Sequence, residues 1–68
     1  MNYIVMETQT TNGTTAIVTP IIYADKNQAE SKFHQILAAA AVSNVQKHTA
    51  MILTDDGNIE KSQCYTHE

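Results

Sequence analysis

Two stretches near the start of the chain have the residue types of paired β-strands. Residues 2–10 and 15–23 are rich in Ile, Val, Thr and Tyr, and they flank the dipeptide Asn12-Gly13. Asn-Gly suits a type I′ turn, because both central residues of that turn need positive φ. A two-residue loop pairs Thr8 with Ile17 and predicts a hairpin whose core side carries Ile4, Met6, Ile17 and Ile21. Because proline has no N–H to donate, Pro20 indicates an edge or a bulge in the second strand.

The middle of the chain predicts one helix over residues 26–42. Asp25 is a suitable N-cap with Gln28 three residues later, and Ser43-Asn44 end the helix. Apolar residues at helical spacing form one stripe that suits packing on a sheet: Ala29, Phe33, Ile36, Leu37 and Ala40. The last part of the helix is apolar on every side, and one sheet cannot cover both sides of a helix. A contact between subunits is therefore expected at Leu37, Ala38, Ala39 and Val42.

A second hairpin is predicted from residues 45–54 and 59–67, around another type I′ signal, Asp56-Gly57. Centring the turn there pairs Met51 with Ser62 and Leu53 with Glu60. Neither side of this hairpin is wholly apolar, and a slip of one residue would exchange the two sides. The core side is assigned Val45, Met51, Leu53 and Cys64.

Together these elements predict an α+β fold of the ββαββ type. It has one four-stranded antiparallel sheet with a single helix packed on one face, and residues 1–68 form one small domain. Because the helix runs opposite to the second strand, the third strand starts antiparallel to the first. The expected strand order is 2-1-3-4.

Composition narrows the classes of function. A chain of 68 residues buries only about 60% of its unfolded surface, and the single cysteine, Cys64, excludes an internal disulfide. A homo-oligomer is therefore expected. Four lysines face seven acidic residues and there is no arginine, which disfavours nucleic-acid binding. No secretion signal or membrane span is present in the sequence, so we expect a cytoplasmic protein without nucleic-acid or membrane partners.

Hydrogen-bonding side chains gather on one side of the second hairpin in the predicted register. His48 lies opposite Tyr65, Gln46 lies opposite His67, and Gln63 is on the same side. Histidine and tyrosine combine a flat apolar body with a polar tip, which suits contact with a ligand or a partner. The pattern is more often that of a solvated face stabilised by cross-strand pairs. The predicted binding residues, two of them from the helix and its end, are His34, Ser43, Gln46, His48, Gln63, Tyr65 and His67.

Motifs of catalysis and of metal binding are missing. Cys64 and His67 are three residues apart, so an extended strand points them to opposite faces and they cannot share an ion. Residues 55–60 lack the alternating ligands of a calcium loop. Both glycines belong to turns, and no serine has an adjacent base or oxyanion loop. We expect no metal, no cofactor and no enzymatic activity.

Four stretches carry a resemblance to a known family: IVMETQT, AESKFHQILAAAAVSNVQKHTAMIL, DDG and QCYTHE. Together they resemble a family of small proteins common in phages and prophages of Gram-positive bacteria, over nearly the whole chain. The family pattern includes residues equivalent to His34, Ser43, His48 and Tyr65, which the fold alone would not demand. The resemblance implies a phage context, in which small proteins without enzymatic motifs are often antagonists of host defence. No established activity of the family can be transferred to these residues.

Two kinds of function are compatible with these features. The first is a non-catalytic oligomeric binding protein that sequesters a small polar ligand, such as a nucleotide immune signal, between subunits. The lack of arginine counts against a highly charged ligand, although backbone N–H groups, Lys47, Lys61 and the histidines could hold a phosphate. The second is an inhibitor that docks on a host defence protein through the helix end or a sheet edge. A minor structural or assembly protein of the virion is a further alternative.

Overall fold

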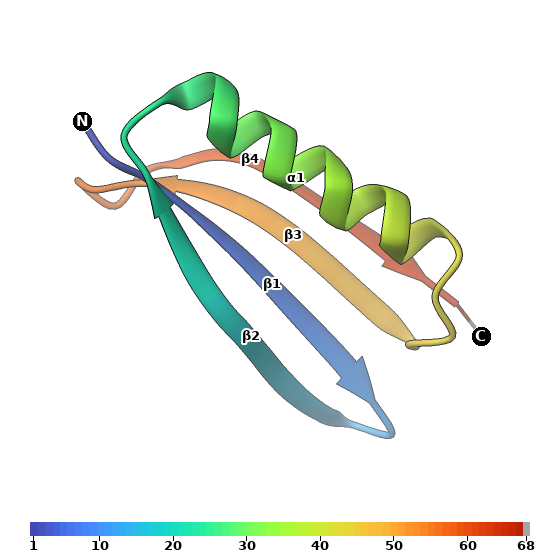
Figure 1. The fold of residues 1–68 in the computed structure, drawn as a ribbon. Helices are drawn as coiled ribbons and strands as arrows, with labels where there is room; N and C mark the ends of the chain where they lie inside the picture. The colour runs from blue at the N-terminus through green and yellow to red at the C-terminus, as the bar shows by residue number, and fades with distance from the viewer. Residues whose placement is uncertain (68) are drawn as a thin grey trace.

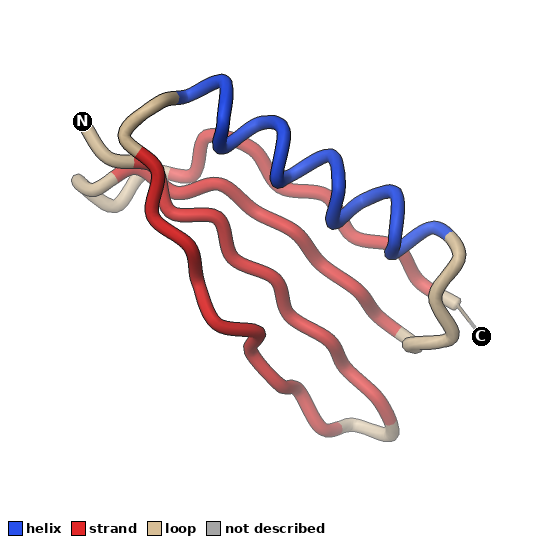
Figure 2. Tube along the Cα trace, in the orientation of Figure 1, coloured by secondary structure: helices blue, strands red, loops and turns tan. Residues whose placement is uncertain are grey.

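The computed structural model describes residues 1–67 and has two hairpins separated by one helix (Figure 1). The elements are β1 (Tyr3–Thr11), β2 (Thr14–Tyr23), α1 (Lys26–Ala41), β3 (Lys47–Thr54) and β4 (Ile59–Thr66). The strands form one antiparallel sheet in the order β2-β1-β3-β4, and α1 lies across one face of it (Figures 1 and 2). The predicted fold class and strand order are confirmed.

The first hairpin has the predicted turn. Asn12 and Gly13 have φ values of 53° and 81°, as the central residues of a type I′ turn require. Thr8 pairs with Ile17 as expected, but the register shifts between Val5 and Glu7 of β1, opposite the part of β2 that contains Pro20. Because β2 is also an edge strand, both expectations from the proline are confirmed.

Helix α1 begins and packs as its sequence predicts. The Asp25 carboxylate accepts a hydrogen bond from the Asn27 backbone N–H at 2.9 Å, which satisfies one of the free donors of the first turn. Four residues of the predicted stripe are buried and the fifth, Leu37, packs partly against the core; the buried four are Ala29, Phe33, Ile36 and Ala40. Within residues 1–67, no helix has the length and the apolar character needed to cross a membrane.

The second hairpin follows the predicted register but not the predicted turn. Met51 pairs with Ser62, whereas a bulge pairs Leu53 with Ile59 instead of Glu60. Gly57 has a φ of 90°, but Asp56 is not among the residues with positive φ, so the type I′ assignment is wrong here. The four-residue loop is held by the Thr54 hydroxyl instead: it accepts from the Asn58 backbone N–H at 3.1 Å and donates to the Asp56 carboxylate.

The side of the sheet that packs against α1 is not the side assigned to the core from the sequence. Val5, Ala50 and Ile52 are buried beneath α1, whereas Ile17 is 64% exposed and Cys64 is also exposed. Four residues assigned to the core are only partly buried, on the side away from α1: Ile4, Met6, Met51 and Leu53. Two others do not belong to the uncovered side. Ile21 pairs with Val5 and so lies on the side of α1, and Val45 comes before β3 begins. The core was assigned to the side with the larger apolar residues, and most of these residues lie on the uncovered side.

We call this uncovered side the open face. It consists of alternate residues of the two central strands, flanked by residues of β2 and β4. Its central residues are Ile4, Met6, Thr8 and Thr10 of β1 and Lys47, Thr49, Met51 and Leu53 of β3. Its flanking residues include Thr15, Ile17 and Ile22 of β2 and Ile59, Ser62, Cys64 and Thr66 of β4. The rest of residues 1–67 forms no layer over it (Figure 1).

Candidate functional site

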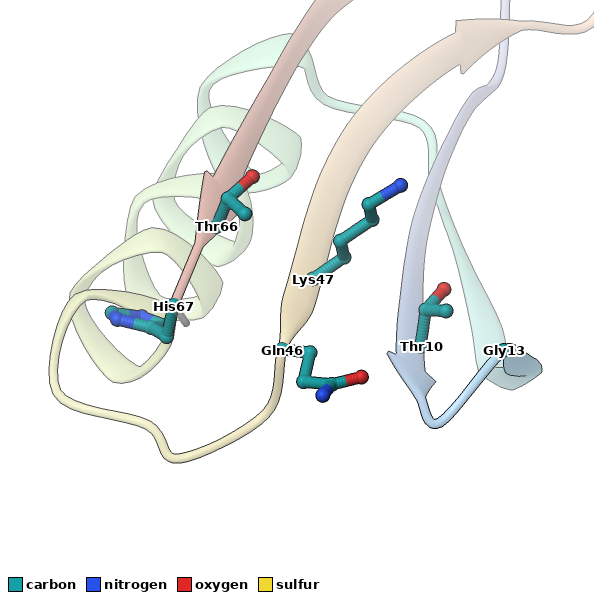
Figure 3. A pocket seen from close by; sticks show the side chains of 6 residues that line it. All are labelled: Thr10, Gly13, Gln46, Lys47, Thr66 and His67. Atoms are coloured by element: carbon teal, nitrogen blue, oxygen red, sulfur yellow. The ribbon is translucent and has the colours of Figure 1, made fainter.

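A pocket of about 470 Å³ lies at the end of the sheet where β1 and β4 finish and β3 begins (Figure 3). It is lined by Thr10, Gly13, Gln46, Lys47, Thr66 and His67. Three of these residues, Thr10, Lys47 and Thr66, are direct neighbours across the sheet and belong to the open face. Two of the seven predicted binding residues, Gln46 and His67, are thus brought together here.

Gln46 connects the two hairpins at the floor of the pocket. Its side-chain oxygen accepts a hydrogen bond from the Asn12 backbone N–H at 2.7 Å, so the start of β3 is tied to the first turn. An amide oxygen that is occupied in this way leaves the NH₂ group of the same side chain as a donor. Gln46 can therefore fix the pocket's shape and donate to a ligand.

His67 holds the end of β4 against the end of α1. Its Nε2 donates to the Ala40 carbonyl at 2.8 Å, and its backbone N–H donates to the Gln46 carbonyl at 2.7 Å. In Figure 3 the ring points toward the helix, while Lys47 extends on the other side of the strand. A histidine donor at a helix C-terminus complements the negative end of the helix dipole. The ring of His67 is therefore engaged in holding the wall of the pocket.

Lys47 supplies the positive charge of the pocket. The ion pairs that lysines form in residues 1–67 join Lys26 to Glu60 at 3.3 Å and Lys61 to Glu30 at 2.7 Å. The hydrogen bond and the charge of Lys61 lower the pKa of Glu30, and Glu60 acts on Lys26 in the same two ways to raise its pKa. Within the described residues, Lys47 has no such acidic partner.

Threonines flank Lys47 on both neighbouring strands of the sheet. The Thr10 hydroxyl lies 2.9 Å from that of Thr15, and Thr66 stands on the other neighbouring strand. Hydroxyl and amide groups can turn a donor toward an anion, and the lysine provides the charge. The arrangement is suited to one small anionic group, and it contains no nucleophile paired with a base.

His48 lies in the interior, not on an exposed face. It is 4% exposed, and its Nε2 donates to a Glu7 carboxylate oxygen that also accepts from the Gln9 side chain at 3.1 Å. The other ring nitrogen, Nδ1, is buried without a partner in the described residues. The expected exposure of this residue is wrong, because the side of β3 that carries His48 is the side covered by α1.

The remaining predicted binding residues lie apart from the pocket. Tyr65 is partly buried beside His48, and Gln63 is exposed one pair further along β4. The Ser43 hydroxyl accepts from the Val45 backbone N–H at 3.1 Å, in the loop after α1. His34 is exposed, with its ring edge against Phe33 at a centroid distance of 5.7 Å. None of the four lines the pocket.

Four pocket residues were missing from the predicted set, although Lys47 had been named as a group that could hold a phosphate: Thr10, Gly13, Lys47 and Thr66. The signal that could have found them is the strand register. Thr66 was already paired with Lys47 in the predicted second hairpin, and placing β3 beside β1 brings Thr10 into the same row. Following the register across β1, β3 and β4, and not only within each hairpin, places these residues together.

The predicted subunit contact on α1 is exposed at its outer positions. Ala38 and Ala39 are exposed and Val42 is 85% exposed, while Leu37 faces the core. The surface is thus accessible to a partner. Its use as a contact between subunits stays a prediction.

No group of three His, Cys, Asp or Glu side chains within residues 1–67 is placed to hold a metal ion. Comparisons with protein-family models, with curated proteins and with solved structures found no match to this chain.

Proposed function

We propose that the protein is a non-catalytic binding protein that holds a small polar ligand, through a phosphate or similar anionic group, in the pocket at the end of the sheet. The observation that carries the proposal is the position of Lys47. It lies without an acidic partner among the described residues, between the threonines of the two neighbouring strands.

The pocket supports a ligand of modest charge. One ammonium can neutralise about one negative charge, and the hydroxyls of Thr10 and Thr66 and the Gln46 amide can donate further hydrogen bonds. Because the pocket is open and contains one charged group, we expect a dissociation constant on the order of micromolar to millimolar for a single phosphate group. A ligand with additional apolar or aromatic surface would bind more tightly.

The biological part of this proposal is a sponge for a nucleotide signal of host defence. It is supported by the resemblance to small phage proteins and by the fit between a phosphate group and the pocket's donors. In this function the protein acts without a cofactor, and its partners are its ligand and further copies of itself.

The proposal is tested by titrating the protein with inorganic phosphate and with a nucleoside monophosphate while recording amide chemical shifts. We expect the shifts to concentrate at Thr10, Gly13, Lys47 and Thr66. Lys47→Met, which keeps much of the side chain's apolar length, should weaken binding at least tenfold. Lys32→Met, on α1, removes the same charge elsewhere and should leave binding unchanged. Equal losses in both variants would show general charge attraction and would overturn the proposal.

A second function, docking onto a different protein, is favoured by the apolar edge of the sheet. Strand β2 contains no charged residue, and four of its large apolar side chains are 38–66% exposed: Ile17, Val18, Ile21 and Ile22. An edge strand of this kind can pair with another chain. A complex with a host protein that persists whatever small molecule is added would favour this function over the first.

A further inference from the structure

The open face carries more large aliphatic side chains than the face that α1 covers. Its residues form four rows across the sheet, which the register defines. The first row is Ile22, Ile4, Leu53 and Ile59, and the second has Met6, Met51 and Ser62. The third row is Ile17, Thr8, Thr49 and Cys64, and the fourth is Thr15, Thr10, Lys47 and Thr66. Apolar character therefore falls from the first row to the fourth, and the charge of Lys47 lies at the polar end.

We propose that a second copy of this chain packs on the open face, sheet against sheet, around a two-fold axis that runs along the strands between β1 and β3. The helices then lie on the two outer sides of the dimer. This surface is distinct from the α1 positions around Val42, and the pairing does not depend on a ligand in the pocket.

The pattern of the rows selects this axis. Rotation about an axis along the strands stacks each row on the same row of the partner and exchanges β1 with β3. Met6 then lies over the partner's Met51, and Ile4 lies over the partner's Leu53. Sheets that pack face to face keep their strands within about 30° of each other, so these pairings hold near the axis.

The placement of charge agrees with the same axis. Lys47 comes over the partner's Thr10, so the two ammonium groups are not stacked directly on each other. A two-fold axis that lies between the two sheets but runs perpendicular to the strands would instead stack Lys47 on the partner's first row. Its charge would then be buried against Leu53. That arrangement would cost desolvation without a compensating partner.

The size of the face is sufficient for a dimer. The sheet has four strands, and both strands of the second hairpin have eight residues. At about 4.8 Å between strands and about 3.3 Å per residue, one face covers roughly 500 Å² in projection. Two copies would therefore bury about 1,000 Å² or more, which reaches the lower limit of specific protein interfaces. A smaller partner segment would leave much of the first two rows exposed.

This dimer also places the two pockets at one end of the interface. The fourth row contributes Thr10, Lys47 and Thr66 to each pocket, so the lysines of both copies approach the same space. An anion bound there would contact both subunits and reduce the repulsion between the lysines. Phosphate should then strengthen the dimer.

The first test is the oligomeric state by sedimentation and light scattering. The wild type should be a dimer at tens of micromolar. Met6→Lys should raise the dimer dissociation constant at least tenfold, because it places a charge against the partner's Met51. Ile22→Lys, at a site that is 66% exposed, should weaken the dimer without disturbing the monomer fold. Val18→Lys, on the same strand but on the side of α1, is the matched control and should stay dimeric.

The second test is charge complementation across the axis. Met51→Glu alone should also raise the dimer dissociation constant at least tenfold, and an equimolar mixture of Met6→Lys and Met51→Glu proteins should form heterodimers. A wild type that is monomeric at about 100 µM would overturn the proposal and would leave the face for a different protein. Loss of the dimer on Val42→Asp but not on Ile22→Lys would assign the contact to α1 and would equally overturn it. Phosphate binding by Lys47 is measured separately, so failure of the dimer and failure of the ligand site are distinguishable.

Discussion

The pair formed by Glu7 and His48 gives a quantitative test of how the helix-covered face is stabilised. Glu7 accepts hydrogen bonds from the ring of His48 and from Gln9, beneath α1. The side chain of His48 is 4% exposed and that of Glu7 is 17% exposed, so water cannot easily replace the carboxylate. Glu7→Ala therefore leaves a buried imidazole N–H without an acceptor.

The magnitude follows from the two lost hydrogen bonds. An unsatisfied buried donor costs about 1–3 kcal/mol, and the partly buried bond from Gln9 adds about 0.5–1 kcal/mol. We expect Glu7→Ala to lower the free energy of unfolding by about 2–4 kcal/mol. For a chain of this size, whose total stability is on the order of 3–10 kcal/mol, that is a large fraction. The midpoint of thermal unfolding should fall by about 10–25 °C.

The control is removal of both partners. Replacing Glu7 and His48 together by valine removes the polar groups while keeping residue types that suit strands, so the double variant should be close to the wild type in stability. Urea and thermal unfolding followed by circular dichroism at one fixed protein concentration measure Glu7→Ala and the double-mutant cycle of wild type, Glu7→Val, His48→Val and the double variant. A loss below about 0.5 kcal/mol in Glu7→Ala, or a double variant that equals the sum of the two single losses, would refute the reasoning.

Four further predictions concern the turns, the helix and a surface ion pair. Gly13→Ala should lower the free energy of unfolding by about 1 kcal/mol or more, because φ is 81° there, and chemical denaturation measures it. Asp25→Ala should cost about 1 kcal/mol through loss of the bond to the Asn27 N–H, measured by the same unfolding curves. Lys61 holds the pKa of Glu30 below its ordinary value. The pair therefore stabilises the fold at every pH above that ordinary pKa, and this contribution is lost as the pH falls through the lowered pKa. Lys61→Met should therefore raise the pKa of Glu30 in an NMR titration, and an unchanged pKa would contradict the assignment. Val42→Asp should lower the oligomer mass in light scattering if the exposed end of α1 is a second contact between subunits, and an unchanged mass would reject that contact.

Much of the fold could be predicted because its local signals are strong and agree with one another. Asn12-Gly13 specifies a tight turn, Asp25 caps the helix, and the stripe that includes Phe33 and Ile36 specifies which side of α1 is buried. The strand order then follows from the direction of the helix. The type of the second turn was predicted wrongly from its dipeptide, because the side chain of Thr54 stabilises a four-residue loop that Asp-Gly alone does not indicate.

The candidate site was predicted only in part because its residues come from three separate strands and a turn. Gln46 and His67 were found within one hairpin, whereas Thr10 and Gly13 join them only after β3 pairs with β1. His48 was misplaced for a related reason. Its exposure depends on which side of the sheet the helix packs against. That side is set by tertiary packing, and the pattern of residues along the strands does not determine it.

Side-chain size, more than the number of apolar residues, explains which face α1 covers. The helix meets the sheet through small residues: Ala29, Ala40 and Ala50 are each at most 1% exposed. Alanines allow the helix to approach closely, and Val5 and Ile52 fill the remaining space beside Phe33. The open face carries the longer side chains Met6, Met51 and Leu53, which suit the spacing of about 10 Å between stacked sheets. The covered face thus suits a helix, and the open face suits the second sheet proposed above. Ala50→Leu should therefore lower the free energy of unfolding by about 1–3 kcal/mol in urea denaturation, whereas enlarging Thr49 on the open face should change only the association of copies, which light scattering measures.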